Sequence, residues 1–543
     1  MLKPEPGAVC ILRRIRRGSL DTVYSKFTSG RYRNMAQFYI GKEKPYLWFP
    51  VKKGNPLKLV TAFDAENREN KLLELQVPWP TPEQEPDFWA AVSVKEMEGK
   101  TLLLFGDFPE EYLSCIRQEE TRPSPQPQRP FVHLSPECGW MNDPNGIFYD
   151  RETGLYHCYY QYHPFGIEWG PMYWGHGVSR DLLRWEDRDI ALFPDETGTM
   201  FSGCAFPDEK GDAGFGPGAV LFYYTAAGGE NPWSYGESFT QRLAVSRDHG
   251  ETLQKKCLVL KHIAGENRDP MVFWHEASNA YCMVLYLEEN TFAVFRSREL
   301  LHFEETQRLE LPKAWECPAL FPLPVEGEEG EKWLFWSADG FYFVGNFDGF
   351  TFRQEEPRRK AYLNSIPYAA QCFSGLAGRT VQMTWLRLPN AGGNRTGMMA
   401  IPAELSLVRS GGALLLRTKP AANLEKSMFQ RLSAPEMGTA SCMLEDSPIL
   451  LEGCLAGEEG FLRLEKDGET LLSLNRKELL EGTFLFGAEN MEIPKECRLL
   501  AAESSYQLIV DRGVLELRLG GGVCWAAVPG PLSLKGEWSI AVG

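Results

Sequence analysis

The sequence contains no apolar run that approaches the 18 or so residues a membrane-spanning helix needs, and no signal-peptide core follows its first residues. It also has no C-x-x-C pair and no H-E-x-x-H motif, so we expect no catalytic metal and no cofactor. The 13 cysteines are dispersed single residues, which is typical of free thiols in a reducing compartment. We therefore expect a cytoplasmic protein, unless a signal peptide precedes this sequence.

Positive charge is also scarce, with 57 Lys and Arg against 73 Asp and Glu, a net charge of -16. This balance argues against nucleic acid or an anionic membrane as a partner. No long amphipathic helix is visible, whereas Gly, Pro and aromatic residues are frequent, which favours a β-rich architecture. The 15 tryptophans fit clefts that bind sugars, although core packing accounts for most aromatic residues. We expect a small-molecule substrate, and the sequence leaves open whether the chain forms a homo-oligomer.

The length of 543 residues fits two to four domains. Residues 1–120 alternate short apolar segments with turn residues, which predicts a small N-terminal β-sandwich whose first strand covers residues 9–12. Residues 121–130 are rich in proline and lack periodicity, so they predict a linker. Residues 423–543 alternate again and predict a C-terminal β-sandwich.

Residues 131–422 repeat one pattern five times, in which a polar turn leads into a short apolar strand. The repeats begin 59, 67, 47 and 52 residues apart when they are marked by Asp143, Ser202, Asp269, Glu316 and Tyr368. A period near 50 residues with strands and no helical stripe is typical of propeller blades. We therefore predict an all-β protein with a five-bladed β-propeller as its central domain.

Three of the five repeats carry an acid that is closely followed by proline. Asp143 and Asp269 directly precede proline, and Glu316 precedes Cys317 and Pro318. The prolines could simply mark strand starts, with the acids incidental. However, three carboxylates that meet at the mouth of the propeller's central channel raise each other's pKa. A structural core avoids this costly arrangement of like charges, whereas glycoside hydrolysis requires neighbouring carboxyl groups. The pattern therefore favours a glycosidase site.

The stretch from Trp140 to Gly146 contains two turn signals, Asp-Pro and Asn-Gly, and the second predicts a tight turn at Asn145 and Gly146. Asn142 and Asn145 are candidate hydrogen-bond donors to Asp143. Such donors would keep this carboxylate ionised, as a nucleophile requires.

The other two acids have different neighbours. Glu316 stands between Trp315 and Cys317, an apolar setting that would favour the protonated carboxyl and suit a proton donor. Arg268 should favour the ionised form of Asp269, although adjacent residues of a strand point to opposite faces.

Several motifs occur in a fixed order along the chain: Trp140 to Gly146, Gln161 to Pro164, Trp169-Gly170, Trp174 to His176, Phe201 to Gly203, Arg268 to Pro270, Glu316-Cys317, Gly345 to Gly349 and Met398 to Leu407. This order resembles glycoside hydrolase family 32, which comprises invertases, inulinases, levanases and other β-fructofuranosidases. The resemblance covers roughly residues 129–543, and the combination of motifs is highly specific.

The resemblance implies a five-bladed propeller followed by a β-sandwich, and a retaining double displacement without a metal. By motif match, Asp143 is the nucleophile, Glu316 is the general acid and base, and Asp269 stabilises the transition state. In a retaining enzyme the carboxyl groups of Asp143 and Glu316 should lie about 5–5.5 Å apart. Seven further residues match positions of the family's terminal-fructose pocket: Asn142, Gln161, Trp169, Phe201, Ser202, Arg268 and Trp385.

The chain departs from the family pattern at a few places. His163 replaces the usual Asn after Gln-Tyr, and Cys204 replaces the usual Ser after Phe-Ser-Gly. Residues 363–368 lack the Asp-x-Gly sequence that precedes Tyr-Ala in the family. Whether the fifth blade contacts the leaving group of the substrate is therefore open. The first 120 residues have no counterpart in a minimal family member.

These features support an exo-acting β-fructofuranosidase that releases terminal fructose from fructo-oligosaccharides, inulin- or levan-type fructans and sucrose. A fructosyltransferase or an endo-fructanase with the same site is an alternative. A catalytically inactive fructan-binding protein is a third hypothesis, against which the intact acid triad argues.

Overall fold

The computed structural model describes residues 35–106, 110–124, 128–424, 428–432, 435, 437–503 and 505–543. The strand expected at residues 9–12 lies outside this range. Contacts divide the chain into two compact units, Met1–Pro123 with Glu230–Tyr235, and Ser124–Gly229 with Gly236–Gly543. Within the described ranges, no helix is long and apolar enough to span a membrane.

The first unit contains two small antiparallel sheets. Alternation along one central strand buries Leu47 and Phe49 completely, whereas Trp48 remains partly exposed on the opposite face. Segment Glu230–Tyr235 belongs to this unit, and the Trp233 backbone N–H donates to Glu74 Oε1 at 3.0 Å. The sheets run β1(Met35–Tyr39)-β6(Thr101–Gly106)-β3(Leu57–Asp64)-β4(Lys71–Pro78) and β5(Phe88–Ser93)-β2(Tyr46–Val51)-β7(Arg117–Glu119), with helix α2(Glu110–Leu113) between β6 and β7.

The second unit begins with five consecutive antiparallel sheets, which we call the central sheets. In four of them the strands follow one another in sequence, whereas in the fifth a pair of two-residue strands comes between the second and the third strand. Their strands are β8(Gly139–Asp150), β9(Leu155–His163), β10(Tyr173–Ser179) and β11(Trp185–Asp187); β12(Thr199–Asp208), β13(Ala219–Ala227), β14(Thr240–Ser246) and β15(Gln254–Leu260); β16(Arg268–His275), β17(Ala280–Glu288), β18(Thr291–Ser297) and β19(Glu304–Glu310); β20(Ala319–Pro324), β21(Glu331–Trp336), β22(Phe341–Phe347) and β23(Phe352–Gln354); and β25(Pro367–Cys372), β26(Val381–Leu386), β29(Ala403–Ser410) and β30(Ala413–Pro420). Three two-residue strands pair with them: β24(Arg359–Lys360) with β22, β27(Arg395–Thr396) with β8, and β28(Met398–Met399) with β26.

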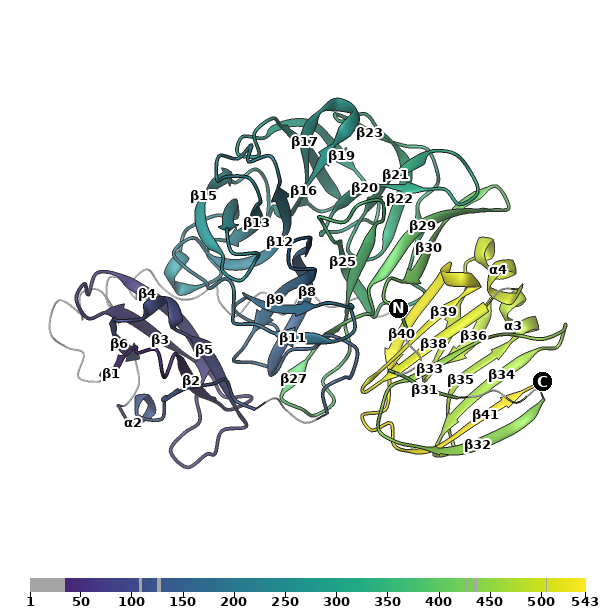
Figure 1. Cartoon of the computed structure of the whole chain (residues 1–543), viewed down its shortest axis with the longest axis horizontal. Helices are drawn as coiled ribbons and strands as arrows, with labels where there is room; N and C mark the ends of the chain where they lie inside the picture. Colours follow the sequence, from purple (N-terminus) through teal and green to yellow (C-terminus); the bar gives the residue numbers. More distant parts are fainter. Residues whose placement is uncertain are drawn as a thin grey trace. The chain divides into compact units, whose positions relative to one another are not determined.

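The first strands of the central sheets meet one another in the middle of this part of the chain (Figure 1). Four of the predicted repeat markers stand in these first strands: Asp143 in β8, Ser202 in β12, Asp269 in β16 and Tyr368 in β25. Glu316 lies three residues before β20. The five polar repeat markers, which are far apart in sequence, therefore lie in one region of the fold.

The predicted tight turn at Asn145 and Gly146 is wrong. Both residues lie inside the continuous strand β8, where the pairing with β9 shifts register between Met141 and Pro144 and again between Asn145 and Phe148. Gly146 has a φ of 49°, and a Cβ there would lie 2.9 Å from the Trp174 ring. The Asn-Gly pair therefore supplies an irregularity in the strand and close packing against it, instead of a reversal of the chain.

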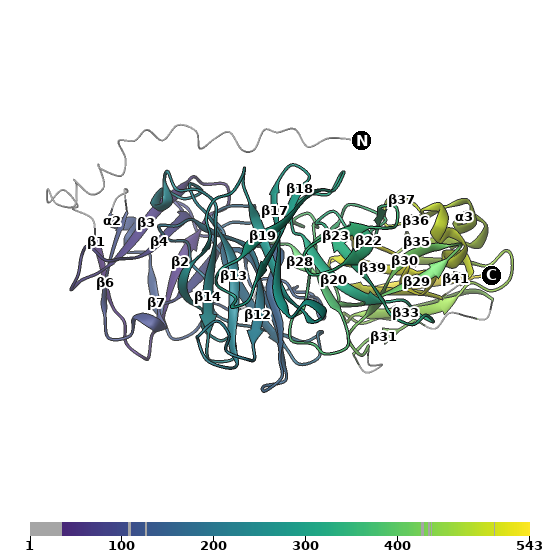
Figure 2. The same ribbon diagram turned by 90° about the horizontal axis from the view of Figure 1, so that it is seen from above.

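Two further sheets complete the second unit and share one hydrophobic core, which contains Leu451, Leu464, Leu508 and Trp538. They lie beside strands β29 and β30 of the fifth central sheet in both views (Figures 1 and 2). The sheets run β31(Gln430–Arg431)-β33(Ile449–Cys454)-β38(Ser505–Asp511)-β39(Val514–Leu519)-β40(Cys524–Pro529) and β32(Gly438–Leu444)-β41(Gly536–Val542)-β34(Phe461–Lys466)-β35(Glu469–Asn475)-β36(Thr483–Phe486)-β37(Glu489–Glu492), with short helices α3(Arg476–Glu481) and α4(Arg498–Glu503).

A fully buried ionic cluster ties the beginning of the second unit to β38 and β39. His133 Nδ1 lies 2.9 Å from Asp511 Oδ2, and His133 Nε2 lies 2.9 Å from Glu516 Oε1. The Asp511 carboxylate also accepts the backbone N–H groups of residues 131–133, and Arg518 pairs with Glu516 at 3.2 Å. Burial alone would lower the pKa of His133, but hydrogen bonds and charge from Asp511 and Glu516 outweigh it and raise the pKa to about 9.

We expect His133→Ala to lower the free energy of unfolding by about 3–5 kcal/mol, because it leaves two buried carboxylates without their shared partner. The raised pKa means that the His133 contribution is fully present below about pH 6.5 and is lost as the pH rises through about 9. Urea unfolding at several pH values measures both effects. The exposed His262 provides the control variant His262→Ala, and an equal pH slope in wild type and His133→Ala would contradict the assignment.

Candidate active site

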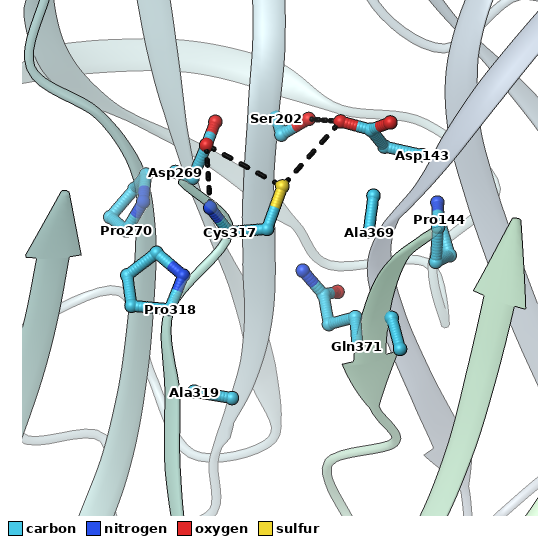
Figure 3. Close-up of a pocket in the computed structure, with 11 residues that line it drawn as sticks. Asp143, Pro144, Ser202, Asp269, Pro270, Cys317, Pro318, Ala319, Ala369 and Gln371 are labelled. Atoms are coloured by element: carbon cyan, nitrogen blue, oxygen red, sulfur yellow. Dashed lines mark hydrogen bonds between the residues drawn. The ribbon is translucent and has the colours of Figure 1, made fainter. Parts of the chain in front are cut away.

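Two carboxylates from two central sheets, those of Asp143 and Asp269, line one pocket (Figure 3), and Glu316 directly precedes Cys317, which also lines it. Asp143 comes from β8, Asp269 from β16, and Glu316 from the segment before β20. Cys317 joins the two aspartates, because its Sγ lies 3.7 Å from Asp143 Oδ2 and 3.5 Å from Asp269 Oδ2. The pocket is lined by Asp143, Pro144, Ser202, Asp269, Pro270, Cys317, Pro318, Ala319, Ala369, Ala370 and Gln371.

Asp143 accepts a hydrogen bond from a nitrogen or oxygen donor on each carboxylate oxygen, besides the contact of Cys317 Sγ with Oδ2. Asn142 Nδ2 donates to Oδ1 at 3.0 Å, and Ser202 Oγ donates to Oδ2 at 2.8 Å. Burial and the charge of Glu316 nevertheless raise the pKa of Asp143, although both hydrogen bonds lower it. The predicted hydrogen bond from Asn142 to Asp143 is present, and it favours the ionised carboxylate. The predicted hydrogen bond from Asn145 is wrong, because the Asn145 amide contacts Ser202 and Gln161 instead.

Asp269 is held at its carboxylate by a backbone N–H and at its own N–H by a side-chain hydroxyl. Its carboxylate accepts the Cys317 N–H at 3.0 Å, and its own N–H donates to Thr225 Oγ1 at 3.0 Å. Burial raises the pKa of Asp269; Arg268, 3.8 Å away, lowers it, and the charges of Glu316 and Asp143 raise it again. The protonation of Asp269 therefore depends on the charges of the other two acids.

Glu316 lies in a polar setting, contrary to the apolar one predicted from its sequence neighbours. Arg268 donates to Glu316 Oε2 from Nη2 at 2.8 Å and from Nε at 3.1 Å. Tyr368 donates its hydroxyl to Oε1 at 2.5 Å. The Trp315 side chain is 43% exposed and its ring packs 5.6 Å from that of Tyr286, so it does not enclose the carboxyl. Arg268 contacts Glu316 more closely than its sequence neighbour Asp269.

Unusual backbone conformations concentrate at this site. Asp269, Glu316, Cys317 and Ala369 have φ values of 64°, 31°, 43° and 49°, in the left-handed region where side-chain-bearing residues cost about 1–3 kcal/mol each. The first strands β8, β12, β16 and β25 also shift register against their neighbours at the site. Bulges of this kind redirect side chains, and here they accompany acids that face the pocket.

The structure brings some of the predicted substrate residues to the acids and places others behind or beside them. Asn142, Ser202 and Arg268 contact the three carboxylates directly. The Trp385 ring lies 5.9 Å from that of Trp140 and 6.2 Å from that of Tyr368.

A second aromatic pair consists of Trp169, 55% exposed, and Phe201, whose ring centroids lie 6.1 Å apart. Gln161 is buried in β9 and donates to the Met200 carbonyl at 2.8 Å, so it links β9 to the start of β12.

The two substitutions within family motifs are both buried. Gly166 and Gly170 pack against the His163 ring, and the Glu168 carbonyl lies 3.1 Å from its Nδ1, so His163 supports the loop that carries Trp169. Cys204 accepts the Val272 N–H on its sulfur at 3.1 Å and is not among the pocket-lining residues.

Three residues at the site were not among the predicted site residues. Cys317 contacts two acids, Tyr368 contacts Glu316, and Thr225 contacts the backbone of Asp269. Cys317 adjoins a predicted catalytic acid and Tyr368 marks the fifth repeat, so both positions carried a signal. Nothing in the sequence near Thr225 indicates its contact. Among the described residues, no group of three or more His, Cys, Asp or Glu side chains is arranged to hold a metal ion.

The profile described as "Glycosyl hydrolases family 32 N-terminal domain" matches residues 133–418. This match spans more than half of the chain and contains all three acids. The chain therefore belongs to glycosyl hydrolases family 32.

Individual relatives also match part of the chain. A levanase of Bacillus subtilis is 36% identical over 284 residues, which cover 48% of this chain and 40% of the levanase. An invertase of Debaryomyces hansenii is 37% identical over 284 residues, covering 47% of this chain and 52% of the invertase. The chain thus spans about half the length of these curated relatives.

A solved structure of a glycoside hydrolase family 32 protein from Bifidobacterium adolescentis covers 94% of this chain and 97% of its own. Its TM-score is 0.61 at 18% sequence identity, so it establishes similarity of fold alone.

Proposed function

We propose that the protein is a retaining, exo-acting β-fructofuranosidase that releases terminal fructose from fructo-oligosaccharides, from inulin- or levan-type fructans and from sucrose. The observation that carries this proposal is a group of three acids with different partners: Asp143 and Asp269 line the pocket, and Glu316 stands next to the pocket-lining Cys317. The names of the matched relatives, a levanase and an invertase, support the substrate class.

In the first step, Asp143 attacks the anomeric carbon of the terminal fructosyl unit. The glycosidic bond breaks as Glu316 donates its proton to the leaving oxygen, and a fructosyl–Asp143 ester forms. The hydrogen bonds that Asn142 and Ser202 donate to Asp143 aim its oxygens. Asp269 stabilises the positive charge that develops on the sugar ring.

In the second step, the ionised Glu316 takes a proton from water, and the resulting hydroxide oxygen attacks the anomeric carbon. The ester bond breaks, fructose leaves with its configuration retained, and Asp143 is again a carboxylate. The separation of about 5–5.5 Å between the two carboxyl groups stays a prediction of this mechanism.

We also propose the finer architecture that the sequence predicts. The five central sheets would be the blades of a β-propeller over residues 131–422, and the last two sheets a β-sandwich over residues 423–543. The meeting of the five first strands in Figure 1 supports the propeller, and the shared core of the last two sheets supports the sandwich. Residues 1–120 would form an accessory domain joined by a linker at 121–130.

The cytoplasm is the proposed location. The twelve cysteines in the described part of the chain are free thiols, which fits a reducing compartment. Expression of the full chain with a fluorescent tag in its native cell would locate it.

The products formed over time from sucrose, inulin and levan test the proposed function. We expect free fructose from the first minutes on all three substrates, because an exo-acting enzyme removes one terminal unit at each turnover. An early ladder of oligosaccharides from inulin or levan would indicate endo action. Longer products from concentrated sucrose would indicate transfer, and no fructose from any substrate would overturn the proposal.

Arg268→Met is expected to lower kcat/KM by about two orders of magnitude, as loss of a charge-stabilising group does. The Arg268 charge lowers the pKa of Asp269. Its removal should therefore raise that pKa and move the acidic limb of the pH–rate profile to higher pH. Sucrose hydrolysis between about pH 4 and pH 9 measures the shift. The exposed pair of Arg308 with Glu305 supplies the control Arg308→Met, and an acidic limb that stays in place would contradict the role given to Arg268.

A further inference from the structure

The segment that leads into β25 runs along strand β40, which belongs to the last two sheets of the chain, here called the C-terminal sheets. Tyr362 and Trp525 form a parallel bridge, and the Leu363 N–H donates to the Trp525 carbonyl at 2.9 Å. Asn364 Nδ2 donates to the Ala527 carbonyl at 2.7 Å. Strand β40 is the last strand of its sheet, so this segment occupies its otherwise open edge.

The next residues connect the segment to the tyrosine of the site. Arg387 donates from Nε to the Ser365 carbonyl at 2.9 Å, and from its backbone N–H to the Ile366 carbonyl at 2.8 Å. The same guanidinium lies over the Tyr368 ring, with its carbon 4.1 Å from the ring centroid. Bonds to β40 on one side and to Arg387 on the other therefore fix the chain just before Tyr368.

Tyr368 passes this constraint to Glu316. Its hydroxyl donates to Glu316 Oε1, while Arg268 holds Oε2, so the carboxyl has little freedom to rotate. Ala369, the next residue, is in the left-handed region with a φ of 49°, and its N–H donates to the Ala338 carbonyl at 3.0 Å. A displacement of the segment at residues 362–366 would consequently displace the tyrosine hydroxyl.

We propose that Asn364 is a positioning residue for the reaction, because its hydrogen bond to Ala527 makes strand β40 part of the scaffold that sets Tyr368 and, through it, Glu316. The inference rests on the proposed function, in which Glu316 transfers the proton. It falls in residues 363–368, where the chain lacks the family's Asp-x-Gly sequence. The contacts of Asn364 and Arg387 fix the approach to Tyr368 at that place.

Asn364→Ala and the isosteric Asn364→Asp both remove the donor to Ala527. A misplacement of about 1 Å can cost up to about 100-fold in rate. We expect a partial displacement that lowers kcat on sucrose about 10-fold and leaves KM within about twofold. The basic limb of the pH–rate profile should move in the direction in which Tyr368→Phe moves it. The control Gln430→Ala removes hydrogen bonds to the Glu445 and Ser447 carbonyls within the C-terminal sheets and should keep wild-type kinetics.

A double-mutant cycle separates positioning from stability. If Asn364 acts through Tyr368, Asn364→Ala should change kcat less than twofold in the Tyr368→Phe background. Equal fold losses in both backgrounds, or a lower melting temperature with unchanged kcat, would overturn the inference. Asn364→Asp, which keeps the shape of the side chain, decides the question if Asn364→Ala does not fold. Wild-type fructose release and its loss in Glu316→Gln establish the proposed function separately, so either idea can fail alone.

Discussion

Asp143→Asn is expected to reduce kcat/KM on sucrose by about four orders of magnitude or more, the scale on which loss of a hydrolase nucleophile is felt. The amide has nearly the shape of the carboxylate but cannot form the fructosyl ester. The pocket should survive the change, because Asn142 and Ser202 reach residue 143 from two sides. Removal of one buried carboxylate also relieves the repulsion that raises the pKa of Asp269, so the fold should not lose stability.

The measurement is fructose release at high enzyme concentration, together with a melting curve. Asp150→Asn is the matched control, since Asp150 ends the same strand and caps the turn at Glu152 and Thr153 away from the pocket. It should hydrolyse sucrose at the wild-type rate. Fructose release within tenfold of wild type by Asp143→Asn would reject Asp143 as the nucleophile.

The positions of these acids could be predicted from the sequence because strand starts carry strong local signals. Proline cannot donate to a sheet ladder and is confined to strand starts and irregularities. Asp143, Asp269 and Glu316 each stand just before such a proline. The spacing of the five repeats then predicted that the strand starts meet, and Figure 1 shows the first strands together.

The direction in which each side chain points could not be predicted, because it depends on backbone irregularities. Arg268 and Asp269 should point to opposite faces of a regular strand. Asp269 has a φ of 64°, and the pairing shifts register between Arg268 and Met271, so both side chains reach the site. The setting of Glu316 was predicted wrongly because its partners Arg268 and Tyr368 are 48 and 52 residues away in sequence.

The contacts from β40 show a second limit of sequence reasoning. Asn364 and Ala527 are 163 residues apart; Asn364 lies in the segment before β25, and Ala527 lies in β40. Neither residue type indicates a catalytic role, and the segment around Asn364 differs from the family pattern at this place. Only the three-dimensional path from β40 through Tyr368 connects them to Glu316.

Glu316→Ala is expected to lower kcat on sucrose by about two to four orders of magnitude, because the leaving oxygen must then depart without a proton. A fructoside with an acidic phenol as its leaving group needs no such help. With that substrate, the first step should remain fast and the second should become slow, because no base activates water. The fructosyl–Asp143 ester should then accumulate, and mass spectrometry of the peptide that contains Asp143 would detect it.

Azide provides the decisive arm of the same experiment, since this anion attacks the anomeric carbon without a general base. Added azide should restore turnover of Glu316→Ala and yield fructosyl azide of retained configuration, while wild type shows no gain. Glu328→Gln is the matched control, because Glu328 follows β20 of the same sheet and also pairs with an arginine, Arg409, but on the surface. If azide restores nothing and no ester accumulates, Glu316 is not the acid and base. An azide product of inverted configuration would instead reject the covalent role of Asp143, because attack on an ester must retain the configuration of the substrate.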